Sequence, residues 1–128
     1  MYGWTPLHFA AEAGRADIAA FLIAKGDDVN ARNKLDLTPL HLAVRSGRTD
    51  LAKLLIAKGA NVNAEQRRGM TPLRLAARFG HRDVVELLIA NGANVNAKDR
   101  LGYTAKDLAE QKSLTEIVEL LRKHGSKE

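Results

Sequence analysis

The sequence contains no cysteine. This absence excludes disulfide bonds, thiolate nucleophiles and zinc sites built on cysteine, so packing alone must hold the fold together. A chain without disulfides is compatible with a reducing compartment, and we expect a cytoplasmic or other intracellular location. The N-terminus lacks the charged and then apolar pattern of a secretory signal. No apolar stretch approaches the ~20 residues of a membrane-spanning helix, so we expect no membrane association.

Aromatic residues are scarce as well. They make up 5% of the 128 residues, although hydrophobic residues make up 45%. This apolar content is too high for a disordered chain, and the length suits a single domain. Because the apolar residues are mostly small and medium aliphatics, the composition favours closely packed helices over a β-sandwich. We therefore expect an all-α fold.

The sequence also lacks the usual signatures of catalysis. None of its three serines, Ser46, Ser113 and Ser126, lies in a G-x-S-x-G motif, and no G-x-x-x-x-G-K-[ST] phosphate loop is present. An enzyme needs a nucleophile with its base, a metal cluster or a phosphate-binding loop. We therefore predict that the chain is not an enzyme, with no catalytic residues, no cofactor and no small-molecule substrate.

The clearest positive feature is a repeat of 33 residues. Several residue types recur in register along the chain, namely Thr5, Thr38, Thr71 and Thr104; Ala10, Ala43, Ala76 and Ala109; Leu22, Leu55, Leu88 and Leu121; and Gly26, Gly59, Gly92 and Gly125. Self-similarity at this period is the signature of a repeat architecture. We predict one domain over residues 1–128, with four repeats at about 1–31, 32–64, 65–97 and 98–128.

Each repeat carries the start and stop signals of two short helices. A Thr-Pro pair, as at Thr38-Pro39, predicts the start of the first helix, because threonine caps free amides and proline suits the first helical position. An aspartate such as Asp50 lies where the first turn of the second helix is expected, and the helix dipole favours a negative charge there. Gly59 stands where a left-handed cap ends that helix. Each repeat is thus predicted to be a helix–turn–helix unit.

Two motifs resemble the ankyrin repeat family. Thr-Pro-Leu-His occurs at residues 5–8 and 38–41, and Gly-Ala-Asn-Val-Asn-Ala occurs at 59–64 and 92–97. The resemblance covers essentially the whole chain. It implies an all-α ankyrin-repeat solenoid with β-hairpin-like loops at one edge, and a non-enzymatic scaffold or adaptor that binds other proteins. It also implies a structural role for His8 and His41, which lie one repeat apart and are too distant to share a metal ion. We expect no metal site.

The sequence departs from the family pattern in several places. Arg74 replaces the motif histidine of the third repeat, and Asp36 replaces a loop glycine, so we expect the turn at Asp36 to differ. The fourth repeat has the polar outer residues of a C-terminal cap. The first repeat looks like an internal one, with no polar cover over the face around Leu7, Phe9 and Ile18. We expect a monomer, with self-association through this N-terminal face as the alternative.

Positions that vary between repeats indicate the binding surface. In the ankyrin family such positions line the concave face formed by the loops and the first helices. The loop positions hold large apolar and arginine side chains, which are enriched at protein interfaces. We expect these side chains to face solvent, so that removing Met70 and Tyr103 should abolish binding with little loss of stability. The predicted partner-binding residues are Trp4, Lys34, Leu35, Leu37, Arg45, Arg67, Arg68, Met70, Arg78, Phe79, Arg100, Leu101 and Tyr103.

The charge indicates the kind of partner. The net charge is +5, and the sequence pI is about 9.7. Arginines gather in the third repeat, where their forked side chains match carboxylates, so we expect a protein partner with an acidic patch. Nucleic acid is a less favoured alternative, since five charges are few and no groove-reading element is visible. A regular frame with a varied surface also fits an engineered ankyrin-type binder or a bare scaffold.

Overall fold

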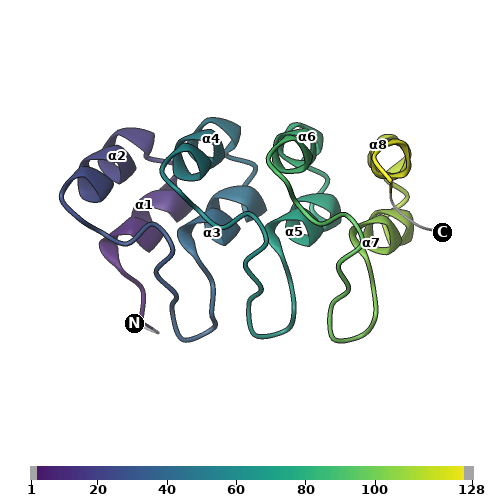
Figure 1. Cartoon of the computed structure of the whole chain (residues 1–128), viewed down its shortest axis with the longest axis horizontal. Coiled ribbons are helices and arrows are strands. Elements are labelled where there is room, and N and C mark those ends of the chain that lie inside the picture. Colours follow the sequence, from purple (N-terminus) through teal and green to yellow (C-terminus); the bar gives the residue numbers. More distant parts are fainter. Residues whose placement is uncertain (1–2, 126–128) are drawn as a thin grey trace.

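The computed structural model describes residues 3–125, which form a row of helix pairs. One layer holds the first helix of each pair, the other layer holds the second, and extended loops project from the first layer along one edge (Figure 1). No strand occurs between residues 3 and 125, so the predicted all-α solenoid is confirmed. The eight helices are α1 (Pro6–Ala13), α2 (Ala16–Ala24), α3 (Pro39–Arg45), α4 (Thr49–Ala57), α5 (Pro72–Arg78), α6 (Arg82–Ala90), α7 (Ala105–Gln111) and α8 (Thr115–Lys123).

A threonine and a histidine together start the first helix of a repeat. In α3 the Thr38 hydroxyl accepts the amide of His41 at 3.3 Å, and Nδ1 of His41 accepts the amide of Thr38 at 3.0 Å. Each side chain thus satisfies a helix-end amide that has no partner within the helix. Thr5 and His8 repeat this reciprocal cap at α1. In α7, Asp107 accepts the amide of Thr104 and takes the place of the histidine.

The same histidines join neighbouring repeats. Since Nδ1 of His41 accepts a hydrogen bond, its Nε2 carries the proton and donates to the carbonyl of Met70 at 3.1 Å. His8 reaches the carbonyl of Leu37 in the same way at 2.8 Å. Both carbonyls belong to the extended loop of the following repeat. The cap of one helix is therefore also a tie to the next unit in the row.

Asparagines tie neighbouring repeats at the loops that follow the second helices. The Asn30 side chain donates to the carbonyl of Gly59 at 3.0 Å and accepts the amide of Asn61 at 2.8 Å. Asn63 makes the equivalent pair of bonds one repeat later, to Gly92 and Asn94. These loops form no strand within residues 3–125, so their backbone groups need such partners.

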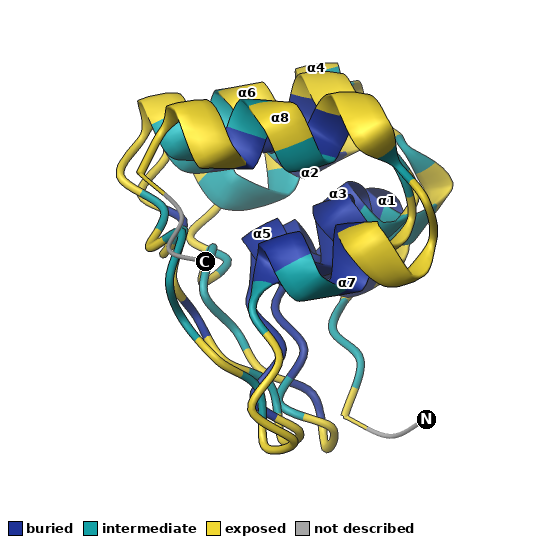
Figure 2. Ribbon diagram, turned by 90° about the vertical axis from the view of Figure 1, so that its right-hand side faces the viewer, coloured by how far each residue is buried: buried dark blue, intermediate teal, exposed yellow. Residues whose placement is uncertain are grey.

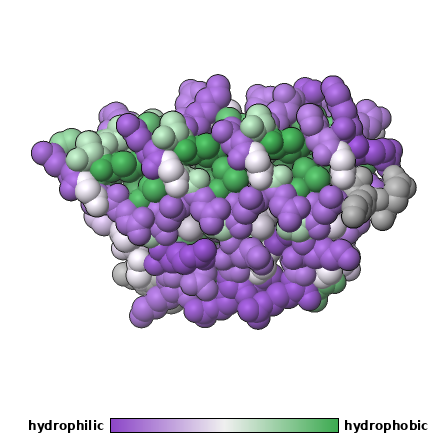
Figure 3. Space-filling model, in the orientation of Figure 1, coloured by the Kyte–Doolittle hydropathy of each residue, from purple (hydrophilic) through white to green (hydrophobic). Residues whose placement is uncertain are grey.

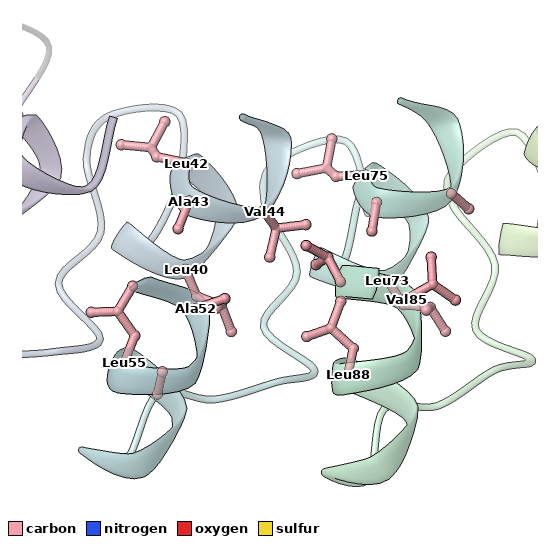
Figure 4. Close-up of a cluster of buried hydrophobic side chains, with 14 of the residues drawn as sticks. Leu40, Leu42, Ala43, Val44, Ala52, Leu55, Leu73, Leu75, Val85 and Leu88 are labelled. Atoms are coloured by element: carbon pink, nitrogen blue, oxygen red, sulfur yellow. The ribbon is translucent and has the colours of Figure 1, made fainter. Parts of the chain in front are cut away.

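The core runs as a continuous seam between the two layers. Its side chains come from the inner sides of all four helix pairs, and Figure 4 shows a central part of it, with Leu40, Val44, Leu55, Leu73 and Leu88 among the labelled residues. Figure 2 shows that α3 and α5 are buried over most of their surface, whereas the second helices are exposed on their outer side. In Figure 3 hydrophilic residues cover the projecting loops, and apolar residues gather in a band nearer the second layer.

Two sequence expectations about local structure are wrong. Asp36 adopts a φ of 62°, in the left-handed region, like Gly69 at 81°. Its amide bonds the carbonyl of Asn33, as that of Gly69 bonds the carbonyl of Gln66, so the turn at Asp36 does not differ. Aspartate is among the few side chains that tolerate this conformation. Leu7 is fully buried in the core, so the expectation that it belongs to an uncovered face is wrong.

Arg74 interrupts the pattern of caps and ties. The hydroxyl of Thr71 still accepts the amide of Arg74 at 3.3 Å, but no reciprocal bond from the side chain completes the cap. The Arg74 side chain is only 1% exposed, and none of its three guanidinium nitrogens has a hydrogen-bond partner among residues 3–125. Burial lowers the pKa of this guanidinium, since removal from water disfavours its charge.

The neutral ring of His41 predicts a stability that depends on pH. Burial lowers the pKa of His41 from 6.5 to about 4. Between these values the unfolded chain binds a proton that the folded chain excludes, so stability is lost as pH falls from about 6.5 to about 4. The contribution lost is at most about 3 kcal/mol. It is measured by urea unfolding across this pH range. His41→Gln should flatten this part of the profile, whereas His124→Gln, at an exposed site, should not; equal slopes for His41→Gln and wild type would contradict the assignment.

The unpartnered side chain of Arg74 predicts a stabilising substitution. Arg74→His would complete the cap with Thr71 and remove the buried charge, and we expect the free energy of unfolding to rise by about 1–3 kcal/mol. Arg74→Met is the matched control, because it removes the charge without restoring the cap and should recover only part of the gain. Chemical denaturation measures both variants. A less stable Arg74→His variant would show that the guanidinium is satisfied in solution.

Candidate functional site

We number the extended loops by the repeat whose first helix they precede, so the second loop comes before α3, the third before α5 and the fourth before α7. A groove of about 490 Å³ lies between the second and third loops and the helices α3 and α5. Its lining combines apolar side chains with four arginines. The lining residues are Leu35, Leu37, Arg45, Gln66, Arg67, Arg68, Met70, Leu75, Arg78 and Phe79. Eight of the thirteen predicted partner-binding residues are brought together here, and the structure adds Gln66 and Leu75.

The shape of each loop is fixed by one side chain that bonds the backbone across the turn. Oδ1 of Asn33 accepts the amides of Leu35 and Leu37 at 2.9 and 3.0 Å. Oδ1 of Asp99 does the same in the fourth repeat, and the amide oxygen of Gln66 accepts the equivalent amides in the third. These side-chain bonds add to a backbone bond across each turn, from the amides of Asn33, Gln66 and Asp99 to the carbonyls of Leu37, Met70 and Tyr103. The loops therefore present their variable residues at fixed positions.

Adjacent loops also contact one another. The amide of Arg67 donates to the carbonyl of Leu35 at 3.3 Å, and the amide of Arg100 donates to that of Arg68 at 3.4 Å. The guanidinium of Arg32 bonds the carbonyl of Glu65 at 2.7 Å. The loop tips consequently form one continuous rim along the edge of the stack.

The floor of the groove corrects the expectation that its apolar residues face solvent. Leu37 is only 7% exposed and Met70 only 8%, and both pack into the core. Their positions just before the capping threonines place them beneath the first helices. Leu35 and Phe79, by contrast, are about half exposed, at 46% and 49%. The buried pair thus supports an apolar surface that the exposed pair offers to a ligand.

The four arginines of the groove are not equally available. Arg45 forms an ion pair with Glu12 at 2.8 Å, and Arg67 donates to the carbonyl of Lys34. The Arg78 guanidinium lies 5.8 Å from the centre of the Phe79 ring. Neither Arg78 nor Arg68 forms an ion pair within the described part of the chain. These two cations are the ones free to meet a carboxylate.

The other predicted residues lie outside the groove. Lys34 and Arg100 are exposed, and Leu101 is 81% exposed at the tip of the fourth loop. Tyr103 is 39% exposed, although it occupies the same repeat position as Leu37 and Met70. Trp4 is partly buried, with its ring tilted against Phe9 at a centroid distance of 5.0 Å. A role in binding for all thirteen residues stays a prediction.

Sequence reasoning missed Gln66 and Leu75 for different reasons. Leu75 shares its repeat position with Leu42 and Leu108, which are core residues, so its position indicates a buried residue and not a binding one. Gln66 shares its repeat position with Asn33 and Asp99, so the 33-residue repeat does place it in a loop. A shared loop position alone does not show which side chains border a groove.

Other kinds of site were also sought in the structure. Among residues 3–125 no group of three histidine, aspartate or glutamate side chains is arranged to hold a metal ion. No helix in this range is long and apolar enough to cross a membrane. Among the described residues, the groove is therefore the best candidate for a binding site, because it combines apolar and basic side chains in one place.

Stacked helix pairs with a grooved rim of loops define a helical repeat solenoid, a class of protein that binds ligands over an extended surface. The family model described as ankyrin repeats (3 copies) matches residues 1–66, 28–99 and 64–128. The chain belongs to the ankyrin repeat family, as predicted from its motifs. Ankyrin repeats generally mediate protein–protein interactions and are typically not enzymes. No curated protein matches the chain significantly.

Burial in the groove predicts different roles for two residues at one repeat position. Met70→Ala should lower the free energy of unfolding by about 2–4 kcal/mol, because it opens a cavity in the core. Tyr103→Ala should cost less than about 1 kcal/mol, since that residue is 39% exposed and is not part of the buried core. Urea titrations of the two single variants measure the difference. Equal losses of stability would contradict the burial of Met70 described above.

Proposed function

We propose that this chain is a non-enzymatic binding module whose groove receives an acidic segment of a protein partner. The observation that carries the proposal is the position of Arg68 and Arg78 beside an apolar surface, with no ion pair of their own among residues 3–125. A partner segment with a large apolar side chain next to a carboxylate would satisfy both features at once.

The apolar half of the groove supports the affinity of such a complex. Leu35 and Phe79 are half exposed above a floor made by Leu37 and Met70. A side chain that enters this space would be removed from water on several sides. Interface residues that contribute most to binding are usually surrounded in this way. The rigid loops also lose little conformational freedom on binding, which favours affinity.

The basic half supports recognition of charge. Arginine presents several N–H donors in a planar fork that fits both oxygens of a carboxylate. Arg78 also stacks near Phe79, so one guanidinium can contact the aromatic ring and an acidic ligand together. Two unpaired cations beside an apolar groove favour a protein segment that alternates the two chemistries over a uniformly charged polymer.

Capture from a cell lysate tests this proposal, with nuclease added in a parallel sample. The double variant Arg68→Ala and Arg78→Ala should lose a protein partner that the unmodified chain retains, with affinity reduced about thirtyfold or more, since a central arginine is often a main contributor to binding. Surface plasmon resonance with the captured partner measures the change. Phe79→Ala should weaken the same complex.

The matched control is the double variant Lys53→Ala and Lys123→Ala. It removes the same charge from exposed positions on α4 and α8, outside the groove, and should bind as the unmodified chain does. Equal losses in the two double variants would show that net charge alone drives binding. A catch that disappears with nuclease would assign the surface to nucleic acid.

A further inference from the structure

The third junction between repeats lacks the histidine bond that joins the earlier repeats. At the first junction His8 donates to the carbonyl of Leu37, and at the second His41 donates to that of Met70. Arg74 occupies the same repeat position, but none of its guanidinium nitrogens has a hydrogen-bond partner in the described part of the chain. The attachment of the fourth loop to the third repeat therefore differs from that of the other two loops.

A second side chain, from the loop itself, acts at the same place in each junction. Oδ1 of Asn33 accepts the amide of Leu37, whose carbonyl is the one that His8 bonds. In the fourth loop Oδ1 of Asp99 accepts the amide of Tyr103, which corresponds to Leu37. The histidine position and the asparagine position thus both act on one backbone residue. At the third junction these two positions hold a cation and an anion.

The residues at these two positions change together along the chain. The pairs are His8 with Asn33, His41 with Gln66, and Arg74 with Asp99. An imidazole is combined with a carboxamide twice, and a guanidinium is combined with a carboxylate once. The loop itself does not require the charge of Asp99, because the uncharged Asn33 makes the same two bonds to amides of the second loop. The negative charge instead matches the positive charge of Arg74.

Burial makes a counter-charge valuable to Arg74. Its side chain is only 1% exposed, and a buried cation without compensation is costly. Burial lowers the pKa of Arg74, and the negative charges of Asp99 and Glu65 oppose this lowering. Glu65 is exposed and screened by water, whereas Asp99 is half-buried. The structure contains no direct ion pair between Arg74 and Asp99, so their attraction acts at longer range through a poorly screening interior.

We propose that Arg74 and Asp99 form an electrostatic attachment of the fourth loop to the third repeat, in place of the histidine bond at the other two junctions. One carboxylate then both orders its own loop and compensates a buried charge in the preceding repeat. The fourth loop, which precedes α7 in Figure 1, does not line the groove, so this attachment is separate from the proposed function. Its consequence is that the fourth loop opens when Asp99 loses its charge, even though the bonds within the loop can still form.

Asp99→Asn separates the two roles of this residue. Asparagine keeps an oxygen for the two amides of the loop, as Asn33 does in the second loop, but it carries no charge. With Arg74 present, this change should lower the folding equilibrium constant at least about tenfold, because the buried cation loses its compensation. In an Arg74→His background, which recreates the pair of the first junction, it should alter the constant less than about twofold. Urea unfolding of the four chains measures this difference.

Hydrogen exchange shows where the effect lies. With Arg74 present, Asp99→Asn should speed the exchange of the Leu101 and Tyr103 amides at least about tenfold, since local opening of the loop exposes them. In the Arg74→His background the same two amides should keep the rates that they have before the change at Asp99. The equivalent amides of the second loop should be unaffected in every variant.

Glu65→Gln is the matched control, because it removes the same charge from an exposed site that also acts on Arg74. It should change the folding equilibrium constant less than about threefold, as is usual for an exposed charge. Losses from Asp99→Asn that are equal with and without Arg74 overturn the proposal, as do unchanged exchange rates in the fourth loop or an equal loss in Glu65→Gln. If Asp99→Asn alone does not fold, the double variant Arg74→His and Asp99→Asn must fold, and its failure to do so also overturns the attachment.

Discussion

Each histidine of the first two repeats bonds two backbone groups from neighbouring repeats: His8 joins Thr5 to Leu37, and His41 joins Thr38 to Met70. The stack depends on this double attachment. One ring nitrogen of His41 accepts the amide of Thr38 and starts a helix, while the other donates to the carbonyl of Met70 in the next loop. The ring must be neutral to do both, and its burial keeps it so. A helix cap and a junction between repeats are thus a single interaction.

The groove follows from these attachments. The carbonyls that His8 and His41 hold belong to Leu37 and Met70, and the side chains of the same two residues form the groove floor. Fixing the backbone there fixes the depth of the floor. At the next junction Arg74 makes no such bond within residues 3–125, and Tyr103, at the corresponding position, is far more exposed. The groove lies where both attachments are complete.

Much of the fold was predictable because its determinants are local and repeated. The threonine caps, the paired helices and the family all follow from residues a few positions apart that recur in each repeat. Burial of Leu37 and Met70 was not predictable in this way, since it depends on the neighbouring loop and helix. The same holds for Leu75, whose position indicates a core residue but whose side chain also borders the groove. That Arg68 and Arg78 are free to bind a carboxylate could not be predicted either, because the sequence does not show which arginines form ion pairs within the fold.

The bonds between repeats span a nearly constant distance along the chain. The Asn30 and Asn63 bonds join residues 29 and 31 apart, and the Arg45–Glu12 pair joins residues 33 apart. Within residues 3–125, the hydrogen bonds and ion pairs described between repeats join adjacent repeats, so the molecule behaves as a one-dimensional chain of coupled units. Folding can then begin in the middle, where a unit has two neighbours, and spread outward without closing a long loop. The second and third repeats, which carry the groove, are held by a neighbour on each side and therefore open less readily than a repeat held on one side only.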